Sequence, residues 1–298
     1  MTVTEVETID TISRDELAAR DRPLRIAGGA RAMAAVARWS PGYLADLLGD
    51  IELAWKQSAT GKHPDFHAAT LAEMFARGRG TPRELFVQLA GDHPERCVFT
   101  GDEEPLVQRR GGVTRMSPKL AALYRDVALP AQVPPDQLYT VWAWFSGRGA
   151  ITWLHYDNNG CHNLNAQLTG EKTCALFSPH DLAALQPFPL GGGNPAYNCS
   201  RLDLDEVDPG VPRQVAHLEP GDLLFIPAWW LHAFHHHGAF NSNVNWWWKP
   251  AHAIDCPPAR RQLLIDLATT AGIAPAVASP EAELLARLDA AAITGPSS

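Results

Sequence analysis

A histidine and an aspartate that stand two residues apart give this sequence its first chemical signal. His155 and Asp157 close the segment Thr152–Asp157, whose β-branched and aromatic composition favours a strand. Side chains at positions i and i+2 of a strand point to the same face, so this imidazole and carboxylate can act together. Taken alone, the pair is a weak signal that often occurs by chance, and an exposed strand pair with no ligand is then the favoured interpretation.

A second histidine, His232, follows a tight turn and a buried apolar run. The turn is Glu219-Pro-Gly-Asp222, and the apolar run ends at Pro227. His232 is distant enough in the chain to lie on a different strand from Asp157. Two histidines and one carboxylate that leave coordination positions open form the facial triad of non-haem Fe(II) oxygenases. His155, Asp157 and His232 match the ligand types of such a triad.

Short strands separated by turn residues must position these ligands. Eight such runs are expected from residue 138 onward, a pattern typical of an antiparallel sandwich or barrel. The predicted strands are Leu138–Phe145, Ile151–Tyr156, Asn163–Leu168, Lys172–Phe177, Gln214–Leu218, Leu223–Pro227, Ala233–His236 and Asn241–Trp248. Before them, mixed structure is predicted, with a strand at Pro23–Ile26 and helices at Ser13, Arg31–Trp39, Pro41, Thr70–Arg77 and Ser117–Arg125. After them, helices are predicted at Ala259–Ala271 and Glu281–Ala292.

Composition excludes several classes of protein. The 298 residues carry a net charge of −8, which argues against a broad nucleic-acid surface, because phosphate binding requires clustered Lys and Arg. The chain contains no apolar run long enough for a membrane span. Five cysteines without a CxxC motif disfavour both a disulfide framework and a thiolate zinc site. We therefore expect a reduced, cytoplasmic protein that does not bind a membrane.

The spacing of these motifs resembles that of the cupin-like, JmjC-type 2-oxoglutarate-dependent oxygenases, among them the asparagine hydroxylase that acts on hypoxia-inducible factor. The segments that carry the resemblance are Thr152–Asp157, Asn163–Lys172, Phe177–Pro179, Pro220–His232 and Asn243–Trp247. The resemblance implies a mainly β fold with flanking helices, a double-stranded β-helix or jelly roll. It also implies an oxygenase domain over residues 23–250, between a partly flexible segment 1–22 and a helical segment 251–298 that would form a homodimer.

Roles for individual residues follow from the same resemblance. His155, Asp157 and His232 would bind Fe(II) and be the catalytic centre, with 2-oxoglutarate as cosubstrate and O2 as oxidant. Lys172 would pair with the distal carboxylate of 2-oxoglutarate, and the other residues expected around the cosubstrate are Thr152, Asn163, Asn245 and Tyr139. Residues expected to line the entrance for the primary substrate are Trp142, Trp144, Arg148, Tyr197, Asn198 and Trp229.

The predicted activity is hydroxylation of an unactivated C–H bond in an amino-acid-like small molecule, a peptide or a protein side chain. Two alternatives stay open, an RNA-modifying hydroxylase of the same family and a catalytically silent cupin that serves as a scaffold. The run His235-His-His237 is not expected to be a metal site, since consecutive strand residues face in opposite directions. His162 and His180 are expected in loops, as polar surface residues.

Overall fold

The computed structural model describes residues 3–48, 52–57, 65–70, 83–90, 97–98, 106–109, 112–115, 118–157, 160–187 and 199–250. The helices predicted over Ala259–Ala271 and Glu281–Ala292, and with them the dimerisation segment, lie outside these residues. The helix predicted from Thr70 onward is not seen in its described part, because Thr70 ends a strand, and residues 71–77 lie outside the described ranges.

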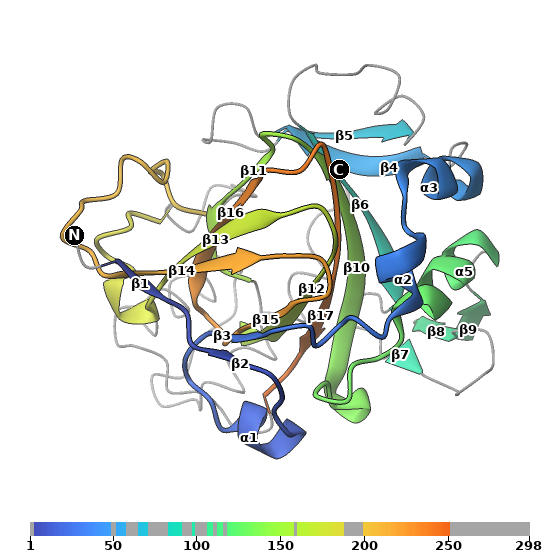
Figure 1. Ribbon diagram of the computed structural model, residues 1–298, viewed down its shortest axis with the longest axis horizontal. Helices are drawn as coiled ribbons and strands as arrows, with labels where there is room; N and C mark the ends of the chain where they lie inside the picture. The colour runs from blue at the N-terminus through green and yellow to red at the C-terminus, as the bar shows by residue number, and fades with distance from the viewer. Residues whose placement is uncertain are drawn as a thin grey trace.

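Two sheets built from short strands form the body of the protein (Figure 1). The eight strands of the central segment are β10 (Leu138–Gly147), β11 (Ile151–His155), β12 (His162–Thr169), β13 (Lys172–Phe177), β14 (Arg213–Leu218), β15 (Leu223–Ile226), β16 (Leu231–His236) and β17 (Phe240–Trp248). The smaller sheet has the order β1-β14-β13-β16-β11, and the larger has the order β2-β3-β15-β12-β17-β10-β6-β4-β5. These eight strands pair antiparallel, which confirms the predicted jelly roll.

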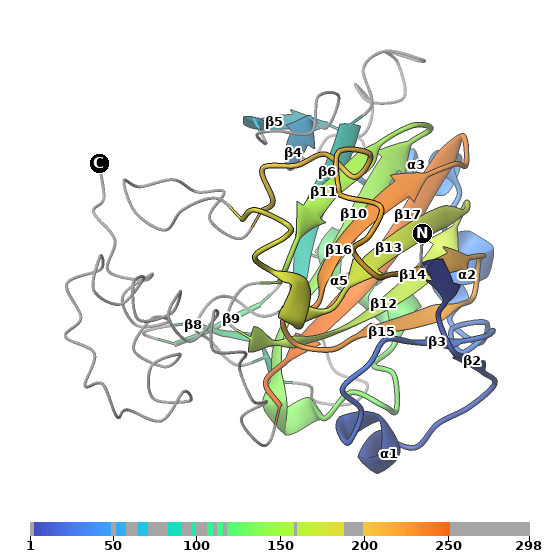
Figure 2. The same cartoon turned by 90° about the vertical axis from the view of Figure 1, so that its left-hand side faces the viewer.

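The remaining elements extend the two sheets or cover them. Their bounds are β1 (Val3–Glu5), β2 (Thr8–Ile9), α1 (Arg14–Ala18), β3 (Leu24–Ile26), α2 (Ala34–Arg38), α3 (Pro41–Leu48), β4 (Glu52–Gln57), β5 (Asp65–Thr70), β6 (Arg83–Ala90), β7 (Cys97–Val98), β8 (Leu106–Arg109), β9 (Gly112–Arg115), α5 (Pro118–Val127), and the 3-10 turns η1 (Pro135–Gln137) and η3 (Pro179–Asp181). Figure 2 shows the barrel strands running side by side, with α1 below β2 and β3.

The structure differs from the sequence prediction in one expected flexible segment and in the starts of two elements. The N-terminal segment, expected to be partly flexible, forms β1 and β2, because its backbone pairs in parallel with β14 and β3. Helix α2 begins at Ala34 rather than Arg31, since Gly28 adopts a φ of 68° and opens a turn. Strand β16 begins at Leu231, so His232 lies inside the strand and not before it.

Alternation along β12, in the larger sheet, separates an apolar outer face from a polar inner face. On β12, Leu164, Ala166 and Leu168 belong to a core cluster that also includes Trp39 from the end of α2 and Leu44 from α3. The intervening residues are also buried, yet they are all amides: Asn163, Asn165 and Gln167. The helices α2, α3 and α5 lie together on one side of the barrel in Figure 1. β12 thus contributes amides to the barrel interior and an apolar face to the core under the helices. The interior also holds apolar side chains, because Leu224 and Ile226, which pair with Asn165 and Asn163, belong to a second apolar cluster.

Asp222 fastens the N-terminal strands to the barrel and explains the Pro-Gly-Asp motif. Its carboxylate, in a residue that is 2 % exposed, accepts hydrogen bonds from Arg25 Nε at 3.0 Å and Nη2 at 2.6 Å. The backbone N–H groups of Gly28 and Glu219 donate to the same carboxylate at 2.9 and 3.0 Å. Four donors around one buried carboxylate fix the turn before β15 against β3.

Replacing Asp222 by alanine should destabilise the whole barrel. The change removes a buried, charge-assisted acceptor and leaves two backbone N–H groups without their partner, so we expect a loss of about 3 kcal/mol in the free energy of unfolding. Urea denaturation monitored by tryptophan fluorescence measures it. The exposed Asp136 provides the control, and Asp136→Ala should change the same quantity by less than about 0.5 kcal/mol. Equal effects of both changes would contradict this account of the motif.

Candidate metal centre

The predicted ligands His155, Asp157 and His232 come together in the structure. One ligand atom from each residue lies within 4.8 Å of the other two. Among the residues that the structure describes, these three form the group that could hold a metal ion. His155 Nε2 lies 3.9 Å from Asp157 Oδ1, and His232 Nε2 lies 3.9 Å from Asp157 Oδ2. These separations are too long for hydrogen bonds, and they leave room for an ion between the three atoms. The side chain of His232 is 2 % exposed, against 19 % for His155, so the site opens on the side of His155.

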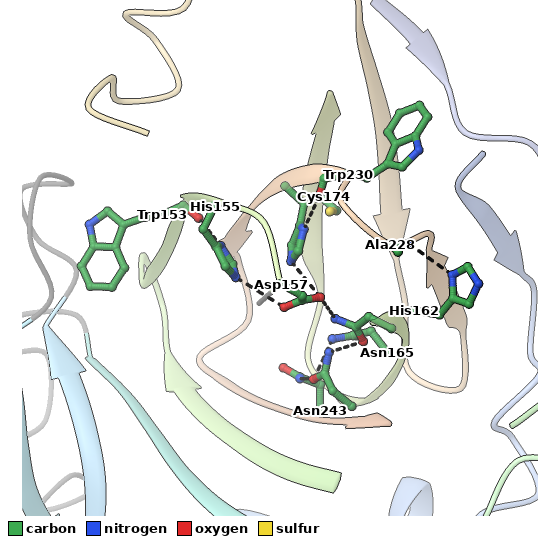
Figure 3. Close-up of polar contacts among 12 residues, drawn as sticks. Trp153, His155, Asp157, His162, Asn165, Cys174, Ala228, Trp230 and Asn243 are labelled. Carbon is green, nitrogen blue, oxygen red and sulfur yellow. Dashed lines mark hydrogen bonds and ion pairs between the residues drawn. The ribbon is translucent and has the colours of Figure 1, made fainter. Parts of the chain in front are cut away.

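Both imidazoles are oriented by the backbone of their own strands. His155 Nδ1 lies 2.7 Å from the carbonyl oxygen of Trp153, and His232 Nδ1 lies 3.0 Å from that of Trp230. A carbonyl can only accept, so Nδ1 carries the proton in each ring and Nε2 keeps its lone pair. Figure 3 shows the His155 ring turned toward Asp157 and the Trp153 ring directed away from it. Such hydrogen bonds fix the tautomer and orientation of histidines that bind metals.

A series of buried amides orients the carboxylate. Asn163 Nδ2 donates to Asp157 Oδ2 at 2.8 Å, and Asn245 Nδ2 donates to Asn163 Oδ1 at 2.8 Å. Asn165 and Asn243 both donate to Asn245 Oδ1, at 3.0 and 2.7 Å (Figure 3). The series therefore ends in a donor to Asp157, which fixes the orientation of this carboxylate between the two imidazoles.

Asn165 and Asn243 did not emerge from the sequence analysis, although the sequence contains a signal for them. Asparagines at alternating positions of β12 and β17, residues 163 and 165 and residues 243 and 245, share one face of their strands. Such a pattern in strands that are buried on both faces indicates a polar interior.

The predicted cosubstrate residues Lys172 and Thr152 lie inside the same barrel. Lys172 is 2 % exposed, and its Nζ lies 4.3 Å from the centre of the Phe234 ring. Thr152, 6 % exposed, pairs with Phe234 across β11 and β16. Cys174 follows Lys172 on the inner face, and complete burial raises the pKa of its thiol, which stays protonated. The interior therefore holds an ammonium, a hydroxyl and a neutral thiol.

A strained turn stands directly before His232. Trp229 has a φ of 77°, a left-handed conformation that a bulky side chain rarely adopts. Its ring packs on Tyr156, with ring centres 6.0 Å apart, and against Gly160, where any Cβ would lie 2.7 Å from the ring. The packing holds the turn that delivers the Trp230 carbonyl to His232. Trp229 is 4 % exposed in this position, and its contact with a substrate stays a prediction.

The other predicted residues are distributed over different parts of the barrel. Trp142 and Trp144 stack at 6.0 Å and pair with Asn245 and Asn243, so they share the inner face with the amide series. Tyr139 lies at a register shift of β10, beneath the Lys249 ammonium at 5.4 Å. Arg148 is exposed in the turn between β10 and β11, at the opposite end of β11 from His155. The remaining two predicted residues lie outside the described ranges: Tyr197 and Asn198.

Two expectations about other histidines have different outcomes. The expected alternation in the triple histidine is confirmed, because His236 is buried while His235 and His237 are exposed. The expectation that His162 is a surface loop residue is wrong. His162 begins β12, is 1 % exposed, and packs between the rings of Phe225 and Trp248 at 5.1 and 5.4 Å.

Comparison with known proteins agrees with this architecture. The family model of the cupin-like domain matches residues 10–254, which cover all eight barrel strands. The chain belongs to the cupin-like family. None of its described helices has the length and apolar character needed to cross a membrane.

Relatives of this cupin-like protein include JmjC proteins. The chain is 31 % identical over 210 residues to the tRNA wybutosine-synthesizing protein 5 of Danio rerio, covering 66 % of this chain and 60 % of the relative. It is 27 % identical over 269 residues to the protein of the same name from Gallus gallus, covering 84 % and 80 %. It is also 29 % identical over 143 residues to the Jumonji C domain-containing protein 5 of Drosophila melanogaster, covering 44 % and 34 %. The chain thus spans less than two thirds of the Danio rerio relative.

Removing the amide that supports the carboxylate should weaken metal binding. We expect Asn163→Ala to lower the affinity for Co(II), titrated by its visible absorption, about 10- to 100-fold, because Asp157 loses the donor that holds it. Asn165→Ala is the matched control, since Asn165 donates to Asn245 and not to Asp157. Its effect should be clearly smaller. Equal losses of Co(II) affinity in the two variants would contradict a specific role for the hydrogen bond from Asn163 to Asp157.

His162 should make stability depend on pH below neutrality. Burial lowers its pKa from 6.5 to about 4, while the backbone N–H of Ala228 donates to Nδ1 at 3.2 Å. As pH falls below about 6.5, the unfolded chain binds a proton that the folded chain excludes until about pH 4, so stability falls through this window. Between pH 7 and 5 the wild type should lose about 2 kcal/mol more than His162→Asn, measured by urea denaturation. Parallel losses in both chains would contradict a neutral buried imidazole.

Proposed function

We propose that this protein is an Fe(II)- and 2-oxoglutarate-dependent oxygenase whose metal ligands are His155, Asp157 and His232. The observation that carries the proposal is the convergence of the three ligand atoms within 4.8 Å. Each of the three side chains is also oriented by a hydrogen bond to a neighbouring group of the protein. Two imidazole nitrogens and one carboxylate oxygen suit Fe(II) and leave coordination positions for a cosubstrate and O2. The donor set therefore fits the metal that the family resemblance implies.

When bound, the iron and 2-oxoglutarate would supply the oxidation of an unactivated C–H bond, with succinate and CO2 as co-products. The chain itself would hold the cosubstrate. Lys172, a buried ammonium, would pair with the distal carboxylate, assisted by the hydroxyl of Thr152. Asn163 and Asn245 would hydrogen-bond around the end nearest the metal, where Asn163 already reaches Asp157. Tyr139 is the proposed further contact of the cosubstrate.

The proposed primary substrate is an amino-acid-like small molecule, a peptide or a protein side chain that reaches the exposed side of His155. Trp142 and Trp144, half-buried on the inner face of β10, would form an apolar wall beside it. The two tryptophan rings would exclude water from the reacting centre and position the C–H bond that is oxidised. A cytoplasmic location of the protein and its dimerisation through residues 251–298 are part of the same proposal.

A second candidate substrate is a tRNA nucleoside. Relatives named for tRNA wybutosine synthesis align with 66 % and 84 % of this chain. Their names weigh against the expectation, based on the net charge of −8, that nucleic acid is an unsuitable partner. Retention of tRNA at low salt that weakens as salt rises would favour this candidate. An absence of retention at low salt would favour the small-molecule and peptide substrates.

Succinate formation tests the reaction class. The protein loaded anaerobically with Fe(II) should convert 2-oxoglutarate to succinate once O2 and a fitting substrate are added, in a screen of amino acids, peptides, ribosomal proteins and tRNA. His155→Ala and Asp157→Ala should abolish the conversion, whereas His235→Ala, on the outer face, should leave it intact. Succinate formation by either ligand variant would overturn the ligand assignment. Failure of the wild type to bind 2-oxoglutarate in calorimetry would favour the silent scaffold instead.

A further inference from the structure

His236 is a buried histidine of the barrel interior that takes no part in the metal centre. It is 1 % exposed and lies four residues beyond His232 on β16, on the same inner face. The rise of a strand, about 3.3 Å per residue, separates the two positions by about 13 Å along β16. His236 thus marks the far end of the interior as seen from the metal ligands.

Both ring nitrogens of His236 contact hydroxyl groups. Nδ1 lies 3.0 Å from Ser146 Oγ, and Nε2 lies 3.4 Å from Thr152 Oγ1. Both hydroxyl-bearing residues are buried, with 0 % and 6 % exposure. Burial at this depth requires that the hydrogen bonds of the imidazole be made inside the protein. The ring is therefore locked between β10 and β11.

The proton on the ring decides what Thr152 can do. A neutral imidazole has one donor and one acceptor nitrogen, and a hydroxyl can do both. If Ser146 donates to Nδ1, then Nε2–H donates to Thr152, and the proton of Thr152 is directed to an acceptor other than His236. In the opposite tautomer the Thr152 hydroxyl donates its proton to His236 Nε2 and cannot donate it to another acceptor.

His236 also faces Lys172 across the sheet. The two residues are direct partners in the pairing of β13 with β16, so their Cβ atoms are about 5 Å apart. Lys172 and Thr152 are the residues proposed above to hold the distal carboxylate of 2-oxoglutarate. An imidazole adjacent to one of them and hydrogen-bonded to the other is placed to influence that carboxylate.

We propose that His236 is a positioning residue that makes the site selective for a 2-oxo acid with a distal carboxylate, by donating to Thr152 so that Thr152 donates to that carboxylate. The inference rests on the proposed function and deepens it. Ser146 selects the required tautomer by donating to Nδ1. Because the candidate metal ligands lie about 13 Å away along β16, the metal-proximal end of the cosubstrate should not depend on His236.

Substitutions that replace one ring nitrogen at a time test this role. Glutamine places an amide donor near the position of Nε2, asparagine reaches only the position of Nδ1, and leucine replaces neither. Calorimetry with Mn(II) in place of Fe(II), without O2, measures binding of 2-oxoglutarate and of 2-oxobutyrate, which lacks the distal carboxylate. We expect His236→Asn and His236→Leu to weaken 2-oxoglutarate binding about tenfold, His236→Gln by less than about threefold, and 2-oxobutyrate binding to change in none of them.

Matched controls separate a positioning role from a structural one. His235→Leu, the neighbouring exposed histidine, should leave both affinities unchanged. Ser146→Ala should weaken 2-oxoglutarate binding in the same direction as His236→Leu, and it provides a second test if the leucine variant does not fold. Equal losses for both ligands, or equal effects of asparagine and glutamine, would overturn the proposal. If the wild type binds neither ligand, the proposed function itself fails, which is a separate result.

Discussion

Polar groups buried inside the barrel must find partners within the protein, and this constraint organises the structure. On β12 the alternation of the strand sends leucines and an alanine outward under the helices and amides inward. The ammonium of Lys172, the hydroxyl of Thr152 and apolar rings such as Phe234 share the interior with these amides. Asn163, Asn165, Asn243 and Asn245 are linked by hydrogen bonds in a series that ends at a carboxylate, and among the described residues Asn165 Oδ1 is the oxygen of the series without a partner. The hydrogen bonding that keeps the interior stable therefore also holds the candidate ligand Asp157 in place.

Backbone geometry prepares the two histidines in the same way. Each Nδ1 donates to the carbonyl two residues earlier in the chain, so the strand itself aims Nε2 at Asp157. For His232 that carbonyl belongs to Trp230, which follows the left-handed Trp229. The strain at this tryptophan is offset by packing against Tyr156 and Gly160. The Pro227–Trp230 turn thus shapes the candidate metal centre, although none of its side chains belongs to the candidate ligands.

The two ends of the interior have different chemistry, and the proposed reaction depends on that division. Histidine nitrogens and a carboxylate converge at one end, while an ammonium and two hydroxyls gather around His236 at the other. A diacid held between them would have one end at the metal and the other at the ammonium. The cupin-like family model covers all the strands that form the two ends.

The pattern of short strands was sufficient to predict an antiparallel sandwich or barrel, and the motifs that carry the family resemblance were sufficient to predict the jelly roll and the convergence of His155, Asp157 and His232. Those features depend on local composition, strand alternation and motif spacing, which are properties of the linear chain. The burial of His162, the strained Trp229 and the contacts of His236 required the tertiary structure. Each depends on which strands become neighbours: β12 must lie against β15 and β17 before His162 can pack on Phe225 and Trp248. Pairing between distant segments is set by the free energy of the whole barrel, and residue types alone do not encode it locally.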